Sequence, residues 1–205
     1  MLKKMLLGAV FAAGFATSAN AVVLYTDNFD ANTGGLNATP NGWNTTVGAV
    51  DIIPVGPFFN WYGSGLYIDL NGSIGQSGQI DTQATFNLVM GQSYTIDFDY
   101  GNNKNSNGNE LLVFGAGSNM SSIPVNGFIA SLISYSWTFV ALNTETVSLF
   151  FADGGNSPGD NGGPILDNVS FSAVPLPAAL PLLAAGLGVM GLVASRRKRR
   201  ARRAA

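Results

Sequence analysis

Apolar and polar residues alternate along much of the chain between residues 22 and 173. The pattern is clearest in residues 94–100, where four apolar side chains alternate with Thr95, Asp97 and Asp99. A period of two is typical of a strand, and here it gives one apolar face and one face with two carboxylates. Further strands are predicted at Val22–Tyr25, Leu66–Leu70, Gln79–Phe86, Leu111–Phe114, Trp137–Leu142, Thr146–Phe151 and Asp167–Ser172.

Clusters of Gly, Asn, Ser and Pro separate these runs, notably at residues 101–109 and 153–164, and no part of the body shows an amphipathic helical pattern. About eight short strands with polar turns predict an all-β fold. We expect one domain, residues 22–173, folded as an antiparallel β-sandwich of the jelly-roll kind.

Residues 1–21 have the pattern of a signal peptide. Lys3 and Lys4 precede an apolar run, and the small-residue site Ala19-Asn20-Ala21 follows it. We expect an N-terminal signal helix that is cleaved after Ala21. A buried first helix or a retained anchor is disfavoured, because the apolar run is short for a membrane span.

Residues 174–203 have the pattern of a membrane anchor. No charge occurs from Val174 to Ser195, a length that gives a helix of about 33 Å at about 1.5 Å per residue. We therefore predict a transmembrane helix at about 178–195 and a basic tail at 196–203. By the positive-inside rule the basic tail lies in the cytoplasm and the body outside. The basic tail begins with Arg196, Arg197, Lys198, Arg199 and Arg200.

Charges are segregated along the chain. Residues 22–173 hold all twelve acidic residues, one lysine and no arginine, which gives this body a formal charge of −11. Binding of a phosphate backbone needs Lys and Arg, so the composition excludes nucleic acid as a partner. The chain has no cysteine and no histidine, which excludes disulfides, thiolate chemistry, imidazole bases and the usual zinc sites.

The tail begins with Val174, Pro175, Leu176, Pro177 and Ala178, followed by the apolar stretch and the basic run. This order resembles the PEP-CTERM sorting signal in its VPLPA variant. The resemblance implies that an exosortase, a membrane-embedded transpeptidase-like enzyme of Gram-negative bacteria that make exopolysaccharide, recognises the tail. It also implies a temporary inner-membrane anchor, cut near the prolines, and a final place at the cell surface or in the extracellular matrix.

Three segments of the body, residues 65–72, 91–94 and 163–171, resemble the galactose-binding-like jelly rolls, above all the DUF642-type and carbohydrate-binding-module-like members. The last of these segments, with its Leu-Asp-Asn-Val-Ser-Phe strand, is the most specific. The resemblance implies glycan binding or cell-wall association, with exopolysaccharide as one candidate partner.

The composition argues against an enzyme, because a nucleophilic triad needs His or Cys. The alternative that remains is a glycan hydrolase that works with carboxylates alone, and Glu110 and Glu145 are the only glutamates. No motif singles out a carboxylate pair. We therefore expect a non-enzymatic exported protein of the envelope or the extracellular matrix.

A glycan site is predicted at a cluster of aromatic residues, because sugar rings stack on flat side chains. The cluster comprises Phe58, Phe59, Trp61 and Tyr62. Four aromatics in five positions include both strand parities, so that some can face the solvent. The alternative is that these rings fill the core.

A structural calcium ion is predicted from strand parity. Asp167 shares its parity with Val169 and Phe171, which places a carboxylate on the inward face. A buried carboxylate needs a partner, and the body offers only Lys104, in a polar loop, so a hard cation held by oxygens is the available counter-charge. Asp27 and Asp30 supply further oxygens.

The resemblance supports this ion. In jelly rolls of this class an acidic residue near the N-terminus and the Asp of the last strand commonly share a calcium. Asp30 and Asp167 match these two positions, although the family usually has Glu at the first. The alternative is that Asp167 only caps a turn through backbone amides.

Overall fold

A computed structural model describes residues 21–54, 61–63, 65–104, 106, 109–127, 130–155, 161–174, 186–188 and 190. Contacts divide the chain into two compact units, the body 21–174 and a unit of the two terminal segments, 1–20 and 175–205. In the terminal unit only 186–188 and 190 are described, and they are helical. The predicted signal peptide and nearly all of the predicted sorting tail therefore lie outside the described residues.

The part of the chain that the structure describes contains no helix long and apolar enough to cross a membrane. In the described residues of the body, the regular elements are all strands. They are β1 Val22–Asp27, β2 Trp43–Val47, β3 Asp51–Pro54, β4 Leu66–Asp69, β5 Asn71–Gly72, β6 Gln76–Ser77, β7 Gln79–Thr82, β8 Phe86–Leu88, β9 Ser93–Asn102, β10 Asn109–Ala116, β11 Asn119–Asn126, β12 Ile133–Val140, β13 Glu145–Val147, β14 Leu149–Asp153 and β15 Pro164–Val174.

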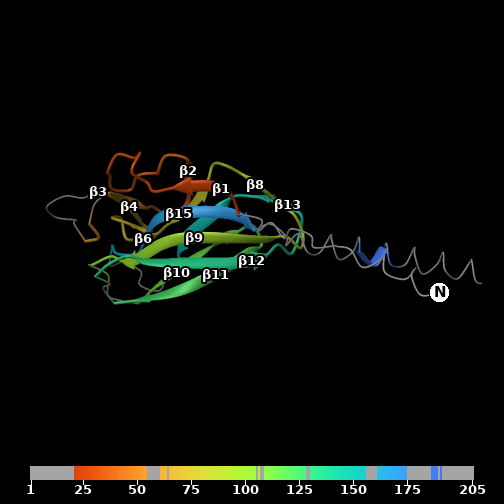
Figure 1. Cartoon of the computed structure of the whole chain (residues 1–205). Coiled ribbons are helices and arrows are strands. Elements are labelled where there is room, and N and C mark those ends of the chain that lie inside the picture. The colour runs from red at the N-terminus through yellow and green to blue at the C-terminus, as the bar shows by residue number, and fades with distance from the viewer. Residues whose placement is uncertain are drawn as a thin grey trace, which may run out of the picture. The chain divides into compact units, whose positions relative to one another are not determined.

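Two antiparallel sheets face each other in the body (Figure 1). The six-stranded sheet has the order β12-β9-β15-β4-β3, and β1 also pairs with β15. Its strand β15 pairs with β4 through its first half and with β1 through its second half. The five-stranded sheet has the order β11-β10-β14-β7-β2, and two small two-stranded sheets, β13-β8 and β5-β6, complete the body.

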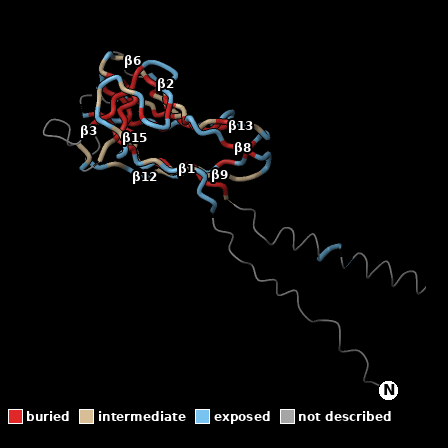
Figure 2. The backbone as a smooth tube through the Cα atoms, turned by 90° about the horizontal axis from the view of Figure 1, so that it is seen from above, coloured by how far each residue is buried: buried red, intermediate tan, exposed pale blue. Residues whose placement is uncertain are grey.

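The core lies between these two sheets, and buried segments run along the facing strands (Figure 2). Strand β9 shows how the sequence produces it, because Tyr94, Ile96 and Phe98 are buried while the alternating residues are only partly covered. Aromatic rings interlock across the interior. Phe114 of β10, for example, lies 4.8 Å from Phe98 of β9 between ring centroids.

One polar contact also ties the two sheets together. Trp43 begins β2 in the five-stranded sheet, is fully buried, and donates its indole Nε1 to Asp27 Oδ2 of β1 over 2.8 Å. The other carboxylate oxygen of Asp27 accepts the backbone N–H of Phe29, which has a positive φ of 56°. The side chain of Asp27 therefore fixes the turn that carries Phe29 into the core.

The predicted all-β antiparallel sandwich is confirmed. Two predicted strands are each divided, because 79–86 breaks between Thr82 and Phe86 and 146–151 breaks at Ser148. Strands β2, β3, β5, β6 and β11 were not predicted from the sequence. Their Asn, Thr, Ser and Pro residues leave too few apolar positions for a clear alternation. Trp43 of β2 and Ile52 of β3 reach the core singly, and Ile123 and Val125 of β11 do so as a pair.

The predicted inward position of Asp167 is wrong. The pairing of β15 with β9 shifts between Asp167 and Ser170, and Asn168 has a positive φ of 50°. This bulge inserts a residue and reverses the parity. Leu166 and Val169 both enter the core, whereas Asp167 pairs with Asp99 and is half-buried on the outer face of the six-stranded sheet.

Replacing Phe114 by alanine tests the account of the core. Phe114 is fully buried and touches Phe98, Tyr135, Trp137 and Phe151 from both sheets. We expect Phe114→Ala to lower the free energy of unfolding by about 3 to 5 kcal/mol, through lost burial and a cavity. Urea unfolding of the full chain measures it.

The control is Met120→Ala, on the neighbouring strand β11, whose side chain is 61% exposed. Its free energy of unfolding should stay within about 0.5 kcal/mol of that of the parent. Equal losses in the two variants would contradict the placement of Phe114 at the centre of the core.

Candidate functional site

Aromatic residues cover one end of the outer face of the six-stranded sheet. Trp61 and Tyr62 pack against a small second cluster of buried residues, Ile53, Tyr67 and Ile165. The ring centroids of Trp61 and Tyr67 lie 6.4 Å apart, and those of Tyr62 and Tyr67 lie 5.6 Å apart at a steep angle. Of the predicted glycan-binding residues, Phe58 and Phe59 lie outside the described residues.

Tyr62 is held in place by contacts of its hydroxyl and of its ring. Its hydroxyl accepts the backbone N–H of Asn102 over 2.9 Å and donates to the carbonyl of the same residue. A Cβ on Gly101 would lie 2.7 Å from the ring, so the glycine leaves room for tyrosine to lie on β9. Burial raises the pKa of the Tyr62 hydroxyl. Tyr62 is therefore a structural support.

Trp61, like Tyr62, is partly buried at the edge of this cluster. Tyr67 lies beneath it, and burial raises the pKa of the Tyr67 hydroxyl to about 12. A partly exposed indole whose orientation is fixed by a neighbouring ring can stack on a sugar at little cost in side-chain entropy.

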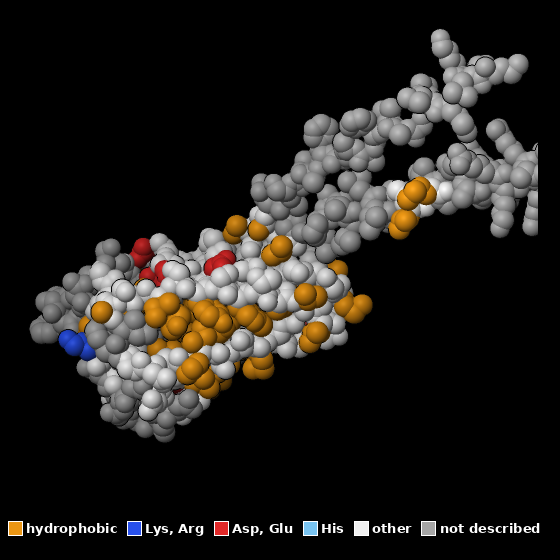
Figure 3. All heavy atoms as spheres, turned by 60° about the horizontal axis from the view of Figure 1, so that its bottom comes forward, with side chains coloured by type: hydrophobic (Ala, Val, Ile, Leu, Met, Phe, Trp, Pro, Cys, Tyr) orange, Lys and Arg blue, Asp and Glu red, His pale blue; other side chains and the backbone are white. Residues whose placement is uncertain are grey.

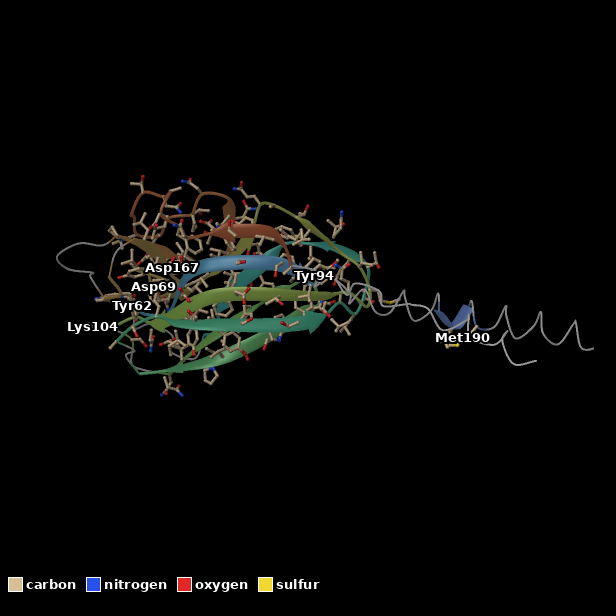
Figure 4. All side chains as sticks on the ribbon, in the orientation of Figure 1. Tyr62, Asp69, Tyr94, Lys104, Asp167 and Met190 are labelled. Atoms are coloured by element: carbon tan, nitrogen blue, oxygen red, sulfur yellow. The ribbon has the colours of Figure 1, made fainter. Side chains whose placement is uncertain are left out.

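Two carboxylates that the sequence did not single out lie beside this aromatic cluster. Asp51 and Asp69 pair across β3 and β4 and are both almost fully buried. Asp69 Oδ1 accepts the backbone N–H groups of Asn71 and Gly163 over 3.0 Å each, and Oδ2 accepts the amide of Asn103. Burial raises the pKa of Asp69 well above its usual value. Figure 4 shows Asp69 near Tyr62 and Lys104 at one end of the body.

A separate group of carboxylates lies further along the outer face, around Asp167. Burial raises the pKa of Asp167 to about 7, and the carboxylates of Asp30, Asp99 and Asp27 add to the effect. Asn168 joins two of them, because its Nδ2 donates to Asp99 Oδ2 over 2.8 Å and to Asp167 Oδ2 over 3.3 Å. The three predicted calcium ligands, Asp27, Asp30 and Asp167, are therefore close enough for their charges to interact.

Protein donors already occupy all three of these carboxylates, and Asp167 Oδ1 accepts the backbone N–H of Asn168 over 2.7 Å. Asp27 accepts the indole of Trp43 and the N–H of Phe29, and Asp30 Oδ1 accepts the N–H of Leu66 over 2.8 Å. No group of three Asp, Glu, His or Cys residues is arranged to hold a metal ion in the described ranges. The donor set suits calcium chemically, since every candidate atom is an oxygen.

The two glutamates lie too far apart to form a hydrolytic pair. Glu110 is at the start of β10, whereas Glu145 Oε1 accepts the hydroxyl of Ser118, just past the end of that strand. Ala116 is six residues beyond Glu110, which corresponds to about 20 Å of strand. A pair of catalytic carboxylates needs a separation of about 5 to 9.5 Å.

The space-filling view shows a band of apolar side chains on the side of the body where β11 and β12 are the edge strands (Figure 3). Tyr135 and Trp137 of β12 are half-buried here and pack against the core. The sequence analysis placed Trp137 in a strand, and its ring belongs to the rim of the core.

Comparison with solved structures shows what the fold is similar to. A cyclase from Fischerella sp. TAU matches with 19% identity and a TM-score of 0.53, covering 78% of this chain and 99% of that one. An arabinose-bound α-L-arabinofuranosidase, MgGH51, matches with 12% identity and a TM-score of 0.51, covering 78% of this chain and 27% of that one. TmCBM61 in complex with β-1,4-galactotriose matches with 16% identity and a TM-score of 0.43, over 64% of this chain and 88% of that one.

The two matches with TM-scores above 0.5 show likeness of fold and nothing more specific. No curated protein matches the sequence. The model of the family described as Protein of unknown function (DUF642) matches residues 19–172, well over half of the sequence, and the chain therefore belongs to the DUF642 family.

Proposed function

We propose that this chain is an exported, non-enzymatic protein whose body binds a glycan through Trp61. The observation that carries the proposal is the partly exposed indole of Trp61, held against the ring of Tyr67, which Tyr62 also contacts. Pyranose faces stack on such rings, and neighbouring amides and carboxylates bond to the hydroxyls. The sandwich fold and the DUF642 membership agree with this function, although a fold alone does not determine it.

The charge of the body narrows the class of glycan. Twelve acidic residues against one lysine create a negative field around the domain. A polymer of uronic acids or sulfated sugars would be repelled by it, whereas a neutral glycan would not. The expected ligand is therefore a neutral oligosaccharide or the neutral part of an exopolysaccharide.

Replacing Trp61 by alanine tests the glycan site. On a glycan array of neutral oligosaccharides, we expect the full chain to bind at least one of them. We expect Trp61→Ala to weaken that binding by about tenfold or more, or about 1.4 kcal/mol, because it removes the stacking surface.

The matched control is Trp137→Phe, at a second half-buried tryptophan that packs against the core instead of the aromatic cluster. Its glycan binding should equal that of the parent. If both variants bind as the parent does, the proposed site is wrong.

We further propose that calcium binds between the first segment of the body and β15, with Asp27, Asp30 and Asp167 as ligands. The proposal rests on the proximity of these carboxylates and on the absence of any arginine from the body. Calcium supplies positive charge where like charges and burial disfavour ionised Asp167.

The expected result is a melting midpoint that rises with calcium concentration and is lower in EDTA. Calcium at a hundred times its Kd would add about 2.7 kcal/mol to the free energy of unfolding. Asp167→Asn should reduce this response.

The control is Asp97→Asn, on the same face of β9 and paired with Ser170. Its calcium response should match that of the parent. A calcium response of Asp167→Asn that equals the parent's would count against Asp167 as a ligand.

For the tail we propose processing by an exosortase and release to the cell surface or the matrix. The proposal rests on the sequence Val174-Pro175-Leu176-Pro177-Ala178, on the apolar stretch and on the basic run that follows. Prolines hold the chain extended and lack amide donors, which suits a peptide that enters a protease.

Replacing Pro175 and Pro177 by alanine should block processing and leave export unchanged. The mass of the mature protein in cells with an active exosortase measures this. A parent chain that keeps its intact C-terminus in such cells would overturn the sorting proposal.

A further inference from the structure

We propose a second calcium site, inside the sandwich, between the side chains of Asn71, Asn102, Glu110 and Asp153. These residues come from the ends of β5, β9, β10 and β14. Asn71 is two residues from Asp69 and Asn102 is two residues from Lys104, and Figure 4 labels Asp69 and Lys104 at one end of the body. The site is distinct from the Asp167 group, which lies on the outer face of the six-stranded sheet.

The two carboxylates face the interior of the sandwich. Glu110 is two residues before the core residue Leu112, and Asp153 is two residues after the core residue Phe151, so all four side chains share the inner face. Leu112 pairs directly with Asp153. Glu110 and Asp153 are therefore diagonal neighbours on adjacent strands, with Cα atoms about 7 to 8 Å apart. Glu110 is 1% exposed and Asp153 is 8% exposed.

Asn71 lies directly against Asp153. Its Nδ2 donates to Asp153 Oδ2 over 3.3 Å, and both residues are buried. Gly163 packs on the other side of Asn71, because a Cβ there would lie 2.7 Å from Asn71 Cβ. The next residue, Pro164, pairs with Asn102 across β15 and β9. This run of contacts links Asn71 to Asn102.

Asn102 in turn lies beside Glu110. Its Nδ2 donates to the carbonyls of Val125 and Gly127, over 3.5 and 3.2 Å. Val125 is the direct partner of Glu110 in the pairing of β10 with β11. Asn71 thus contacts Asp153 directly, and Val125, Gly163 and Pro164 connect the other members of this set of four, Asn71, Asp153, Glu110 and Asn102, which we call the ring.

The amide oxygens of both asparagines indicate that a ligand binds here. Asn71 and Asn102 are fully buried, yet Oδ1 of each has no hydrogen-bond donor among the described residues. Buried polar atoms almost always have a partner. A half-turn of the Asn71 amide exchanges its oxygen and its nitrogen, so the side chain can meet Asp153 directly or through a cation between them.

The charges in this ring also favour a divalent cation. Two carboxylates neutralise one divalent ion, and the only lysine of the body, Lys104, is exposed. The side-chain atoms of these four residues that can bind a metal are all oxygens. Calcium prefers oxygen ligands, whereas zinc prefers nitrogen and sulfur. The ion would join β9 of one sheet to β10 and β14 of the other.

Thermal melting of the full chain in mild detergent, with EDTA and with increasing calcium chloride, tests the proposal. The measurements are made on the Asp167→Asn variant, so that calcium binding at the Asp167 group adds less to the change in melting midpoint. We expect the melting midpoint of this variant still to rise with calcium. Adding Asn71→Leu should abolish the remaining rise. If that double variant does not fold, Asn102→Leu replaces it, because it removes the other amide oxygen.

A charge-adding variant gives the opposite signature. Asn71→Asp places a third carboxylate in the ring, so its midpoint should fall in EDTA and recover with calcium by more than the parent's midpoint rises. The matched control is Asn119→Asp, a buried asparagine at the turn between β10 and β11. Its midpoint should fall in EDTA and in calcium alike.

Two results would overturn the interior site. One is a calcium response in the Asp167→Asn background that Asn71→Leu and Asn102→Leu both leave unchanged. The other is a fall of the Asn71→Asp midpoint that calcium does not reverse. Either result would mean that a protonated carboxyl or a buried water, and not a cation, satisfies the ring.

Discussion

The structure depends on how the body satisfies the carboxylates that it buries. It contains twelve acidic residues, one exposed lysine and no arginine. Asp51, Asp69, Glu110 and Asp153 are all at least nine-tenths buried. An ionised carboxylate in such a place is costly unless donors or a cation surround it. The folding of the loops around each of these groups follows from that requirement.

Backbone amides and small polar side chains meet part of the requirement. Asp51 accepts the N–H groups of Asn37 and Ser73, and Asp69 accepts those of Asn71 and Gly163. These bonds hold the loops at one end of the body against the outer face of β3 and β4. The same end carries Trp61 and Tyr62, so the buried carboxylates help to fix the surface on which the proposed glycan site lies.

Period-two alternation predicted the central strands and the sandwich, because strands such as β9 place every second side chain in the core. It did not predict β11, which pairs with β10 along its whole length but contributes only Ile123 and Val125 to the core. It failed at Asp167, because a single inserted residue at Asn168 reverses parity and leaves no mark in an alternation pattern.

The candidate site was predicted in part. The sequence singled out Trp61, Tyr62, Asp27, Asp30 and Asp167, and the structure places these residues as two groups on one sheet. The buried group around Asp69 and the ring around Asn71 were missed. Both are assembled from strand ends far apart in the sequence, such as Asn71 and Asp153. The sequence did contain one indication of the Asp69 group: Asp69 is an acidic residue inside a predicted strand whose other residues are mostly apolar.

The central claim is that calcium supplies the counter-charge that the sequence of the body lacks. Equilibrium dialysis of the full chain against calcium at millimolar concentration, followed by a count of bound ions, tests it most directly. The account predicts one ion for the Asp167 group and one for the interior ring, with Asp167→Asn and Asn71→Leu each losing one. A folded chain that retains no calcium under these conditions would contradict it.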